Sequence, residues 1–376
     1  MSTITAHRLL APFRDKQDSI TATLGLTATS IILAFLLGAL IMVATGIAPA
    51  AVGLAYLSML DGAFGSLYAV SETLTAATPL ILAGLGIAIA FRCGLFNIGA
   101  EGQLLMGGIA AVFVGFALTG LPLFIHLPVA LLAGAVAGGL WAGIAGMLKA
   151  RTGAHEVITT IMLNFIALRL VDFLLTNPPI QKPGRNDPIS QEALPSATLP
   201  AILDWVEPHY RLNAGIFLAF LMVALVYWLL FHTKLGFEFR TVGANPQAAK
   251  TAGIEIGRTM FLSMAVAGGL AGLAGANQVL GVLGRASPGF SAGIGFDAIA
   301  VALLGRGHPV GVLLAGLLFG ALEAGGRHMH GQAGIALDIV TILQALVLVF
   351  VAAPALTRAI TGKLIPHRAA RPETPS

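Results

Sequence analysis

The sequence contains little charge and almost no cysteine. Only 10% of its 376 residues are Asp, Glu, Lys or Arg, and Cys93 is the single cysteine. Soluble proteins carry about 25% charged residues, so this chain cannot cover itself with a water-facing surface. The scarcity of charge therefore excludes a soluble enzyme, and the high hydrophobicity excludes an intrinsically disordered chain. A lone cysteine also excludes an intramolecular disulfide and a cysteine-clustered metal site.

The sequence also lacks motifs that would supply metal or nucleotide chemistry. It contains no HExxH motif, no Walker A lysine motif and no set of histidines at metal-ligand spacing. We therefore expect that the chain is not an enzyme, holds no metal and binds no cofactor of its own. The net charge of +4 does not require a nucleic-acid partner, because surplus Lys and Arg in a membrane protein reflects its topology.

The sequence contains long apolar runs instead. Hydrophobic residues make up 57% of the chain, and its mean hydropathy is +0.88. A helix of about 20 residues crosses about 30 Å of hydrocarbon. By this criterion we expect about ten segments, at 24–46, 74–91, 99–120, 126–148, 156–175, 214–231, 259–283, 293–305, 309–325 and 334–353. The prediction is an all-α polytopic membrane protein in which some segments, above all 293–305, are broken or re-entrant.

Small residues in these runs predict close helix packing. The chain has 46 glycines, and GxxxG pairs occur at Gly134–Gly138, Gly139–Gly143 and Gly268–Gly272. Such pairs let two helix backbones approach each other within a membrane.

The distribution of Lys and Arg predicts the orientation. If the N-terminus is cytoplasmic, the basic residues that fall outside are only Lys182, Arg185, Arg211, Arg285 and Arg327. The positive-inside rule then places both termini in the cytoplasm. We expect a multi-pass protein of the cell (inner) membrane, surrounded by lipid, with a cytoplasmic segment at 1–20, a transmembrane domain at 21–355 and a cytoplasmic tail at 356–376.

Two loops stand out between the apolar runs. The outside loop 176–213 is rich in proline and polar residues, which predicts a loop or short cap. The inside loop 232–258 carries helix signals, because Asn245 suits an N-cap, Pro246 a first helical position and Gly253 a helix end. A helix of about two turns is marginal alone, so we expect it to dock on another surface. An ordinary ordered loop is the alternative.

Polar residues interrupt the apolar pattern at two places. Residues 92–103 hold three glycines with Asn97, Glu101 and Gln103, which fits a cytoplasmic turn or a broken helix that dips into the protein. We favour the broken helix. On the segment 156–175, Asn164 is followed by Arg169 and Asp172, whose spacing fits a local ion pair as well as a polar pathway.

Several of these stretches resemble the permease subunits of ATP-binding-cassette (ABC) importers. The stretches are Thr78–Gly86, Gly94–Gln103, His155–Asn164, Val242–Ile254 and Gly293–Gly305, within a similarity that covers about residues 20–355. The branch transports branched-chain amino acids, simple sugars and nucleosides. Within it, the sequence is most similar to the permeases for nucleosides such as guanosine, which work with a lipoprotein receptor.

The resemblance implies a set of partners and a mechanism. ATP and Mg²⁺ would bind to a separate ATPase subunit, which pushes on a coupling helix. By resemblance, that helix contains Gly243, Asn245, Pro246, Ala248, Ala249 and Gly253. A second permease subunit would complete a heterodimer, and a solute-binding lipoprotein would dock outside, where loop 176–213 lies.

The solute path is predicted from polar and aromatic residues within the apolar runs. A neutral polar solute requires a few hydrogen-bonding groups and an aromatic wall. The candidates are Asn97, Glu101, Gln103 and Asn164 for hydrogen bonds, with Phe91, Phe96 and Phe165 for the wall. A sugar such as ribose or a branched-chain amino acid is the alternative solute. An ion-coupled secondary transporter is the alternative class, with Asp172 and Asp338 as its candidate carboxylates; a membrane enzyme or a channel fits less well.

Overall fold

The computed structural model describes residues 29–206 and 210–352. Within these ranges every regular element is helical, and β pairing is limited to the isolated bridges Gln181–Ser190 and Ala201–Asn213. The expected all-α fold is therefore confirmed. The expectations for residues 1–20 and 356–376 lie outside the described residues.

The chain divides into two compact units. One unit holds the residues up to Ala55 and those from Ile335 onward. Its described elements are a helix over Thr29–Ala44, the first residues of α2 (Pro49–Phe64) and α13 (Asp338–Ala352). Inside this unit, the buried Ser30 hydroxyl donates a hydrogen bond of 3.1 Å to the carbonyl oxygen of Phe350, which joins the first helix to α13.

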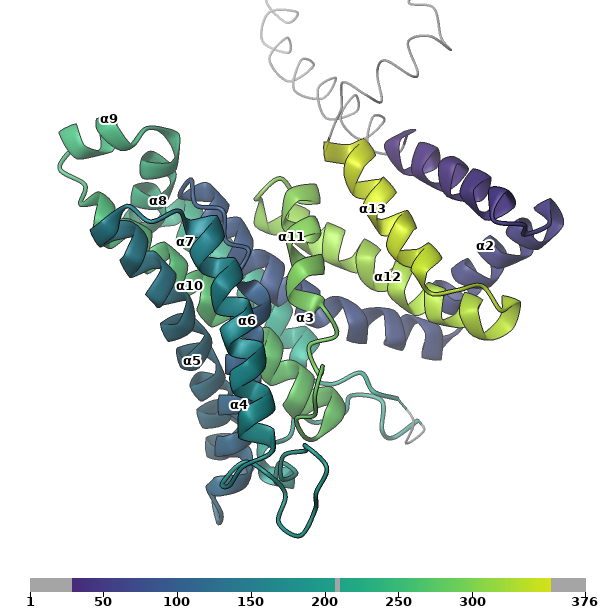
Figure 1. Cartoon of the computed structure of the whole chain (residues 1–376), viewed down its shortest axis with the longest axis horizontal. Coiled ribbons are helices and arrows are strands. Elements are labelled where there is room, and N and C mark those ends of the chain that lie inside the picture. The colour runs from purple at the N-terminus through teal and green to yellow at the C-terminus, as the bar shows by residue number, and fades with distance from the viewer. Residues whose placement is uncertain (1–28, 207–209, 353–376) are drawn as a thin grey trace, which may run out of the picture. The chain divides into compact units, whose positions relative to one another are not determined.

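The other unit, Tyr56–Gly334, contains most of the helices (Figure 1). They are α3 (Leu67–Arg92), α4 (Ala100–Ala117), α5 (Leu123–Thr152), α6 (Glu156–Leu175), α7 (Gly215–His232), α8 (Lys234–Ala244), α9 (Pro246–Thr251), α10 (Ile256–Asn277), α11 (Ile294–Leu304) and α12 (Pro309–Ala333). A π-helical segment, η2 (Gln278–Leu283), continues α10. Helix α3 forms the centre of the hydrophobic core, because its apolar side chains from Leu80 to Ala90 are almost all fully buried.

The described residues contain seven helices that are long and apolar enough to cross a membrane: α3, α4, α5, α6, α7, α10 with η2, and α12. Four shorter apolar helices accompany them: Thr29–Ala44, α2, α11 and α13. The predicted segment 293–305 is indeed a short helix, as expected. Helix α2 was not among the predicted segments; it has 16 residues and contains Asp61.

The glycines of α5 and α10 bring these two helices into backbone contact. A Cβ atom added at Gly268 would overlap the side chain of Ala142 and the backbone of Gly138. A Cβ atom added at Gly134 would lie 3.0 Å from the Cβ atom of Ala276. The close packing predicted from the GxxxG pairs is therefore confirmed, with α10 as the partner of α5.

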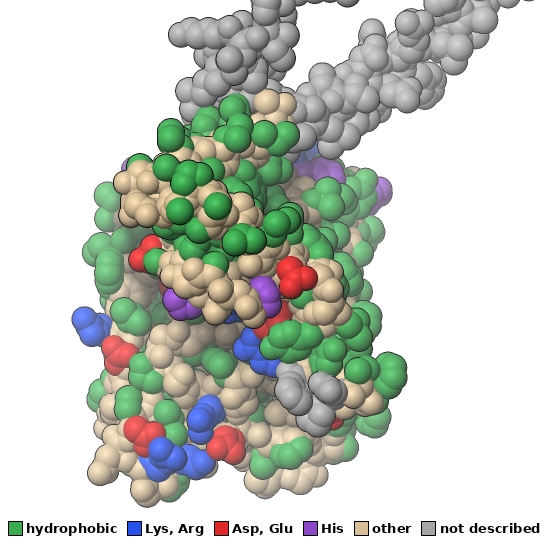
Figure 2. All heavy atoms as spheres, turned by 90° about the vertical axis from the view of Figure 1, so that its right-hand side faces the viewer, with side chains coloured by type: hydrophobic (Ala, Val, Ile, Leu, Met, Phe, Trp, Pro, Cys, Tyr) green, Lys and Arg blue, Asp and Glu red, His purple; other side chains and the backbone are tan. Residues whose placement is uncertain are grey.

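The two long connections lie at opposite ends of the larger unit (Figure 1). Helices α8 and α9 form one end, and the connection from α6 to α7, with the short 3₁₀ helix η1 (Pro195–Ala197), forms the other. Within the connection from α6 to α7, ion pairs join Arg185 to Asp187 at 2.7 Å and Lys182 to Glu192 at 2.9 Å. Figure 2 shows a similar mixture of basic and acidic side chains on the face that it draws.

Candidate functional site

The predicted pathway residues meet at the turn between α3 and α4. The side-chain amides of Asn97 and Gln103 exchange two hydrogen bonds, at 3.0 and 2.9 Å. Asn97 also accepts from the backbone N–H of Gly99 at 2.9 Å. Both amides are fully buried. These two side chains therefore lie inside the protein, and the broken helix favoured from the sequence stays a prediction.

Asn164 on α6 completes this cluster. Its carbonyl oxygen accepts from the N–H of Gly102, and its amide donates to the carbonyl oxygen of Ile98, both at 2.9 Å. These are backbone groups at the start of α4 that have no partner within the helix. The amides of Asn97, Gln103 and Asn164 thus bond to one another and to the chain itself, and their role in a solute path stays a prediction.

The other predicted pathway residues are Glu101 and three phenylalanines, which are not part of this amide cluster. The Glu101 carboxylate accepts from the N–H of Gly295 at 2.8 Å, which ties α4 to the start of α11. The rings of Phe91 and Phe96 stack with centroids 5.0 Å apart. Phe165 is exposed on the surface of the chain. Glu101 thus joins the turn to α11, and Phe91 and Phe96 form an aromatic pair at the turn.

The predicted pair of Arg169 and Asp172 is also present. The two side chains lie 3.4 Å apart on α6, and the Arg169 side chain is 83% exposed. The local ion pair is therefore confirmed, and it lies on an outward face of α6.

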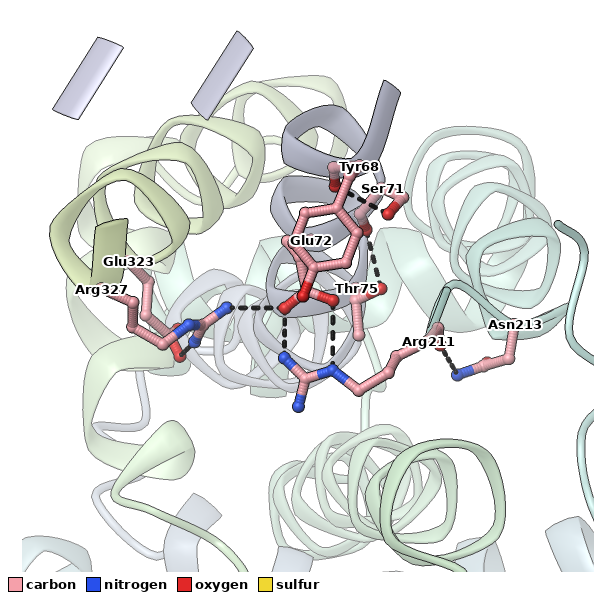
Figure 3. Close-up of polar contacts among 8 residues, drawn as sticks. All are labelled: Tyr68, Ser71, Glu72, Thr75, Arg211, Asn213, Glu323 and Arg327. Atoms are coloured by element: carbon pink, nitrogen blue, oxygen red, sulfur yellow. Dashed lines mark hydrogen bonds and ion pairs between the residues drawn. The ribbon is translucent and has the colours of Figure 1, made fainter. Parts of the chain in front are cut away.

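A second polar cluster, which the sequence analysis missed, surrounds Glu72 on α3 (Figure 3). Glu72 is 6% exposed, and its carboxylate is held by Arg211 from the connection before α7 and by Arg327 from α12. The Nε atom of Arg211 lies 3.1 Å from one carboxylate oxygen, and a second nitrogen bonds the other oxygen. Arg327 lies 3.4 Å from Glu72 and bonds Glu323 at 2.6 Å. Glu72 thus joins three segments that are distant in sequence.

Residues close to Glu72 and Arg211 in the sequence hold these two side chains in place. Ser66 caps α3 by accepting from the N–H of Ala69 at 3.1 Å, which fixes the turn that carries Tyr68 and Glu72. Asn213 holds the segment of Arg211, because its amide donates to the carbonyl oxygens of Arg211 and of Gly281 in η2. The hydrogen bonds from Arg211 to Glu72 hold the pKa of the guanidinium above its ordinary value.

A cavity of about 350 Å³ opens beside this cluster. Its polar lining consists of Asp61, Ser66, Tyr68, Glu72, Arg211, Arg327 and His328. The sequence signals for this site were a glutamate at the edge of an apolar run and two of the few basic residues assigned to the outside. Arg211 and Arg327 are 139 and 255 residues from Glu72, so no local sequence pattern connects the three residues.

The structure forms the helix predicted in the loop 232–258. Asn245 caps α9 by accepting from the N–H groups of Gln247 and Ala248 at 3.0 and 3.1 Å, and Pro246 is its first residue. The chain turns away at Gly253, whose φ is +78°. Ala249 is fully buried while Pro246 and Ala248 are exposed, so α9 has one docked face and one free face.

Helix α8, which was not expected, carries Gly243 and links α9 to the bundle. The side chain of Phe231 on α7 is at the centre of this link. Arg92 and Arg240 lie over its ring at 6.0 and 5.3 Å, and the ring of His308 lies 5.5 Å away. Arg92 also donates a hydrogen bond of 2.9 Å to the carbonyl oxygen of Gly307, in the turn between α11 and α12.

The described residues contain no group of three or more His, Cys, Asp or Glu side chains arranged to hold a metal ion. The pentapeptide GFSAG at 289–293 has the GxSxG spacing of hydrolase nucleophile motifs. That motif requires a turn from a strand into a helix. Here the pentapeptide connects η2 to α11, and Ser291 is buried, so it does not present a nucleophile.

Comparison with known proteins gives consistent matches. Residues 69–352 match the family described as branched-chain amino acid transport system / permease component. The guanosine ABC transporter permease protein NupP of Bacillus subtilis is 43% identical over 336 residues, which cover 89% of this chain and 94% of that protein. The glucose ABC transporter permease protein TsgB13 of Haloferax volcanii is 37% identical over 87% of this chain and 86% of its own. The nucleoside ABC transporter permease protein NupB of Lactococcus lactis is 37% identical over 86% and 89%. No solved structure matches the chain significantly.

Proposed function

The chain belongs to the family of branched-chain amino acid transport system permease components, and we propose that it is the membrane-spanning subunit of an ABC importer for nucleosides. The observation that carries this proposal is the similarity to a guanosine permease along nearly the whole length of both chains. A similarity of this extent covers 89% of this chain and 94% of that protein. The nucleoside permease of Lactococcus lactis supports the same solute class.

A simple sugar is the second candidate solute. The glucose permease of Haloferax volcanii is also similar along most of its length, and the family description names branched-chain amino acids. Nucleosides and sugars are both neutral and rich in hydroxyl groups, so binding either one requires similar hydrogen-bonding side chains. An aromatic wall for the base is the feature that would favour a nucleoside.

ATP hydrolysis belongs to a separate subunit in this proposal. The free face of α9, with Pro246 and Ala248 exposed, would receive an ATPase, while buried Ala249 anchors the helix to the chain. Closure of the ATPase on ATP and Mg²⁺ would move α8 and α9 as a body, and Phe231 would pass that movement to α7 and α3. Such rigid-body motion is a common form of switching in proteins.

The orientation follows from the same assignment. Helices α8 and α9 lie on the cytoplasmic side, with both termini, and the connection from α6 to α7 faces outward, where a solute-binding lipoprotein would dock. A second permease chain would complete the path as a heterodimer, in the cell (inner) membrane. The exposed apolar side chains of α5, such as Leu132 and Leu140, offer surface for lipid or for that second chain.

Reconstitution tests this function directly. The chain is placed in liposomes with its ATPase, a second permease and the receptor, and uptake of radiolabelled guanosine is measured with ATP inside or outside. We expect uptake only when ATP is on the ATPase side, unaffected by a protonophore, and competed by nucleosides more strongly than by ribose, glucose or leucine. Uptake by the permease chain alone, or uptake driven by an ion gradient, would refute an ABC importer, and stronger competition by glucose would refute the nucleoside assignment.

A further inference from the structure

We propose that the cavity beside Glu72 is a solute-contact site within the permease, in which a purine nucleoside stacks its base on Tyr68 and bonds to Arg211 and Arg327. This inference rests on the proposed function and identifies where the chain itself recognises the solute. The cavity of about 350 Å³ lies in the size range of small-molecule sites, which begins at about 300 Å³. Ionisable residues that face a cavity in a membrane protein generally mark a solute path.

The charges around the cavity select a neutral solute. Glu72 is neutralised by Arg211 and Arg327, Arg327 also bonds Glu323, and Asp61 faces His328 at 3.5 Å. The three carboxylates of Glu72, Glu323 and Asp61 outnumber the two guanidinium groups. No surplus of positive charge therefore remains to bind a phosphate. The site therefore favours a nucleoside over a nucleotide.

The two arginines retain donors for such a solute. A guanidinium group has five N–H donors, and the ion pairs described above use only some of them on each arginine. The side chains of Arg211 and Arg327 remain 47% and 39% exposed, so the remaining donors are accessible. A guanidinium fork pairs well with the adjacent O6 and N7 acceptors of guanine. Asp61, whose side chain is 67% exposed, can accept from hydroxyl groups of the ribose.

Tyr68 supplies the aromatic surface. It lines the cavity and is 48% exposed, and its ring is set by an edge-to-face contact with Tyr210 at 5.7 Å. Tyr68, Glu72 and Arg211 line the same cavity and are drawn together in Figure 3. Stacking on an aromatic side chain stabilises a bound base, whichever base it is. The combination of a flat ring and a guanidinium fork distinguishes a purine nucleoside from a free sugar.

Direct binding to the permease tests this site apart from the receptor. The complex of both permeases and the ATPase is placed in nanodiscs without the receptor, and binding of radiolabelled guanosine is measured by scintillation proximity. The variants are Tyr68→Leu, which removes the ring, Tyr68→Phe, which keeps it, and Arg327→Lys, which keeps the charge but loses the fork. Phe124→Leu is the matched control, since Phe124 is an exposed aromatic residue outside the cavity.

We expect Tyr68→Leu and Arg327→Lys each to weaken guanosine binding about tenfold, and Tyr68→Phe and Phe124→Leu to stay within about twofold of the wild type. Guanosine monophosphate should not compete. Unchanged binding in Tyr68→Leu, or no binding by a wild-type complex that still imports guanosine with its receptor, would overturn the site while leaving the proposed function intact. A wild-type complex that fails to import guanosine would instead refute the proposed function. Thermal denaturation of each variant complex confirms that it is folded.

Discussion

Gly94, in the turn after α3, lies in backbone contact with Gly243 of α8. A Cβ atom added at Gly94 would be 3.2 Å from the Cα atom of Gly243, and one added at Gly243 would overlap the carbonyl oxygen of Arg92. Two glycines thus allow α8 to touch the end of α3, most of whose residues are buried. This contact joins the predicted coupling segment directly to α3.

The first prediction concerns this contact. Replacing Gly243 with alanine should reduce ATP-driven uptake at least about tenfold, because the added methyl group pushes α8 away from Arg92. Alanine is a better helix former than glycine by about 1 kcal/mol, so the loss cannot come from helix propensity. Uptake and ATPase activity are measured on the same proteoliposomes, and we expect ATPase activity to persist while uptake falls. Gly331→Ala on α12 is the control, since a Cβ atom there meets nothing within 4 Å. Normal uptake by Gly243→Ala would show that the contact carries no movement.

The second prediction concerns the cap of α9. Asn245→Ala removes the acceptor for the N–H groups of Gln247 and Ala248, at a cost of about 1 kcal/mol to a helix of only 6 residues. We expect receptor-stimulated ATPase activity to fall several-fold. Asn245→Asp retains an acceptor and should keep most of this stimulation, whereas equal losses in both variants would point to a direct contact with the ATPase.

The third prediction separates structural from solute-binding roles of the buried amides. Asn164→Ala leaves the N–H of Gly102 and the carbonyl oxygen of Ile98 without partners in the interior. Each unsatisfied buried group costs about 1–3 kcal/mol, so the melting temperature of the purified chain should fall clearly. Asn177→Ala, whose amide bonds near the surface, should change it little. An unchanged melting temperature combined with lost uptake would instead support the pathway role predicted from the sequence.

The fourth prediction concerns pH. His308 lies just before α12 and faces Tyr227, Phe231 and Arg92. Burial, with the positive charge of Arg92, lowers the pKa of His308 below its ordinary value of 6.5. The unfolded chain therefore binds the proton first, so the contribution to stability is complete above about pH 6.5 and is lost as the pH falls below it.

Thermal denaturation across about pH 7.5 to 5.5 checks this sign. The melting temperature of the wild type should fall on acidification, and His308→Gln should reduce that fall. His155→Gln, which changes an exposed histidine, should behave like the wild type. An acid response that is unchanged in His308→Gln would assign it to another group.

Local signals in the sequence were sufficient for some elements. Asn245, Pro246 and Gly253 lie close together in the chain, and capping depends on contacts within a few residues, so α9 was predicted with its start and its end. The ion pair of Arg169 with Asp172 was predictable for the same reason. Helix α8 was not predicted, because its 11 residues include Gly236 and Gly243 and glycine disfavours a helix.

The Glu72 cluster shows where sequence reasoning failed. Glu72 was left outside the predicted span that starts at 74, and Arg211 and Arg327 served only to orient the chain. The sequence around each of the three residues does not predict its contact with the other two. The fold brings them together because α3 packs against α12 and because Asn213 fixes the segment that carries Arg211.

The sequence by itself determined that this chain resides in a membrane, which family it resembles and where its short capped helix lies. These properties depend on hydrophobic run length, charge balance and neighbouring residues. Only the tertiary structure decided which polar side chains bond to the chain and which face a cavity. Asn164 and Glu72 are both buried polar residues on apolar helices. Asn164 bonds to backbone groups at the start of α4, whereas Glu72 lines a cavity large enough for a solute. The physical reason is that a hydrogen-bond partner is set by distance in space, and these partners come from segments far apart in the chain.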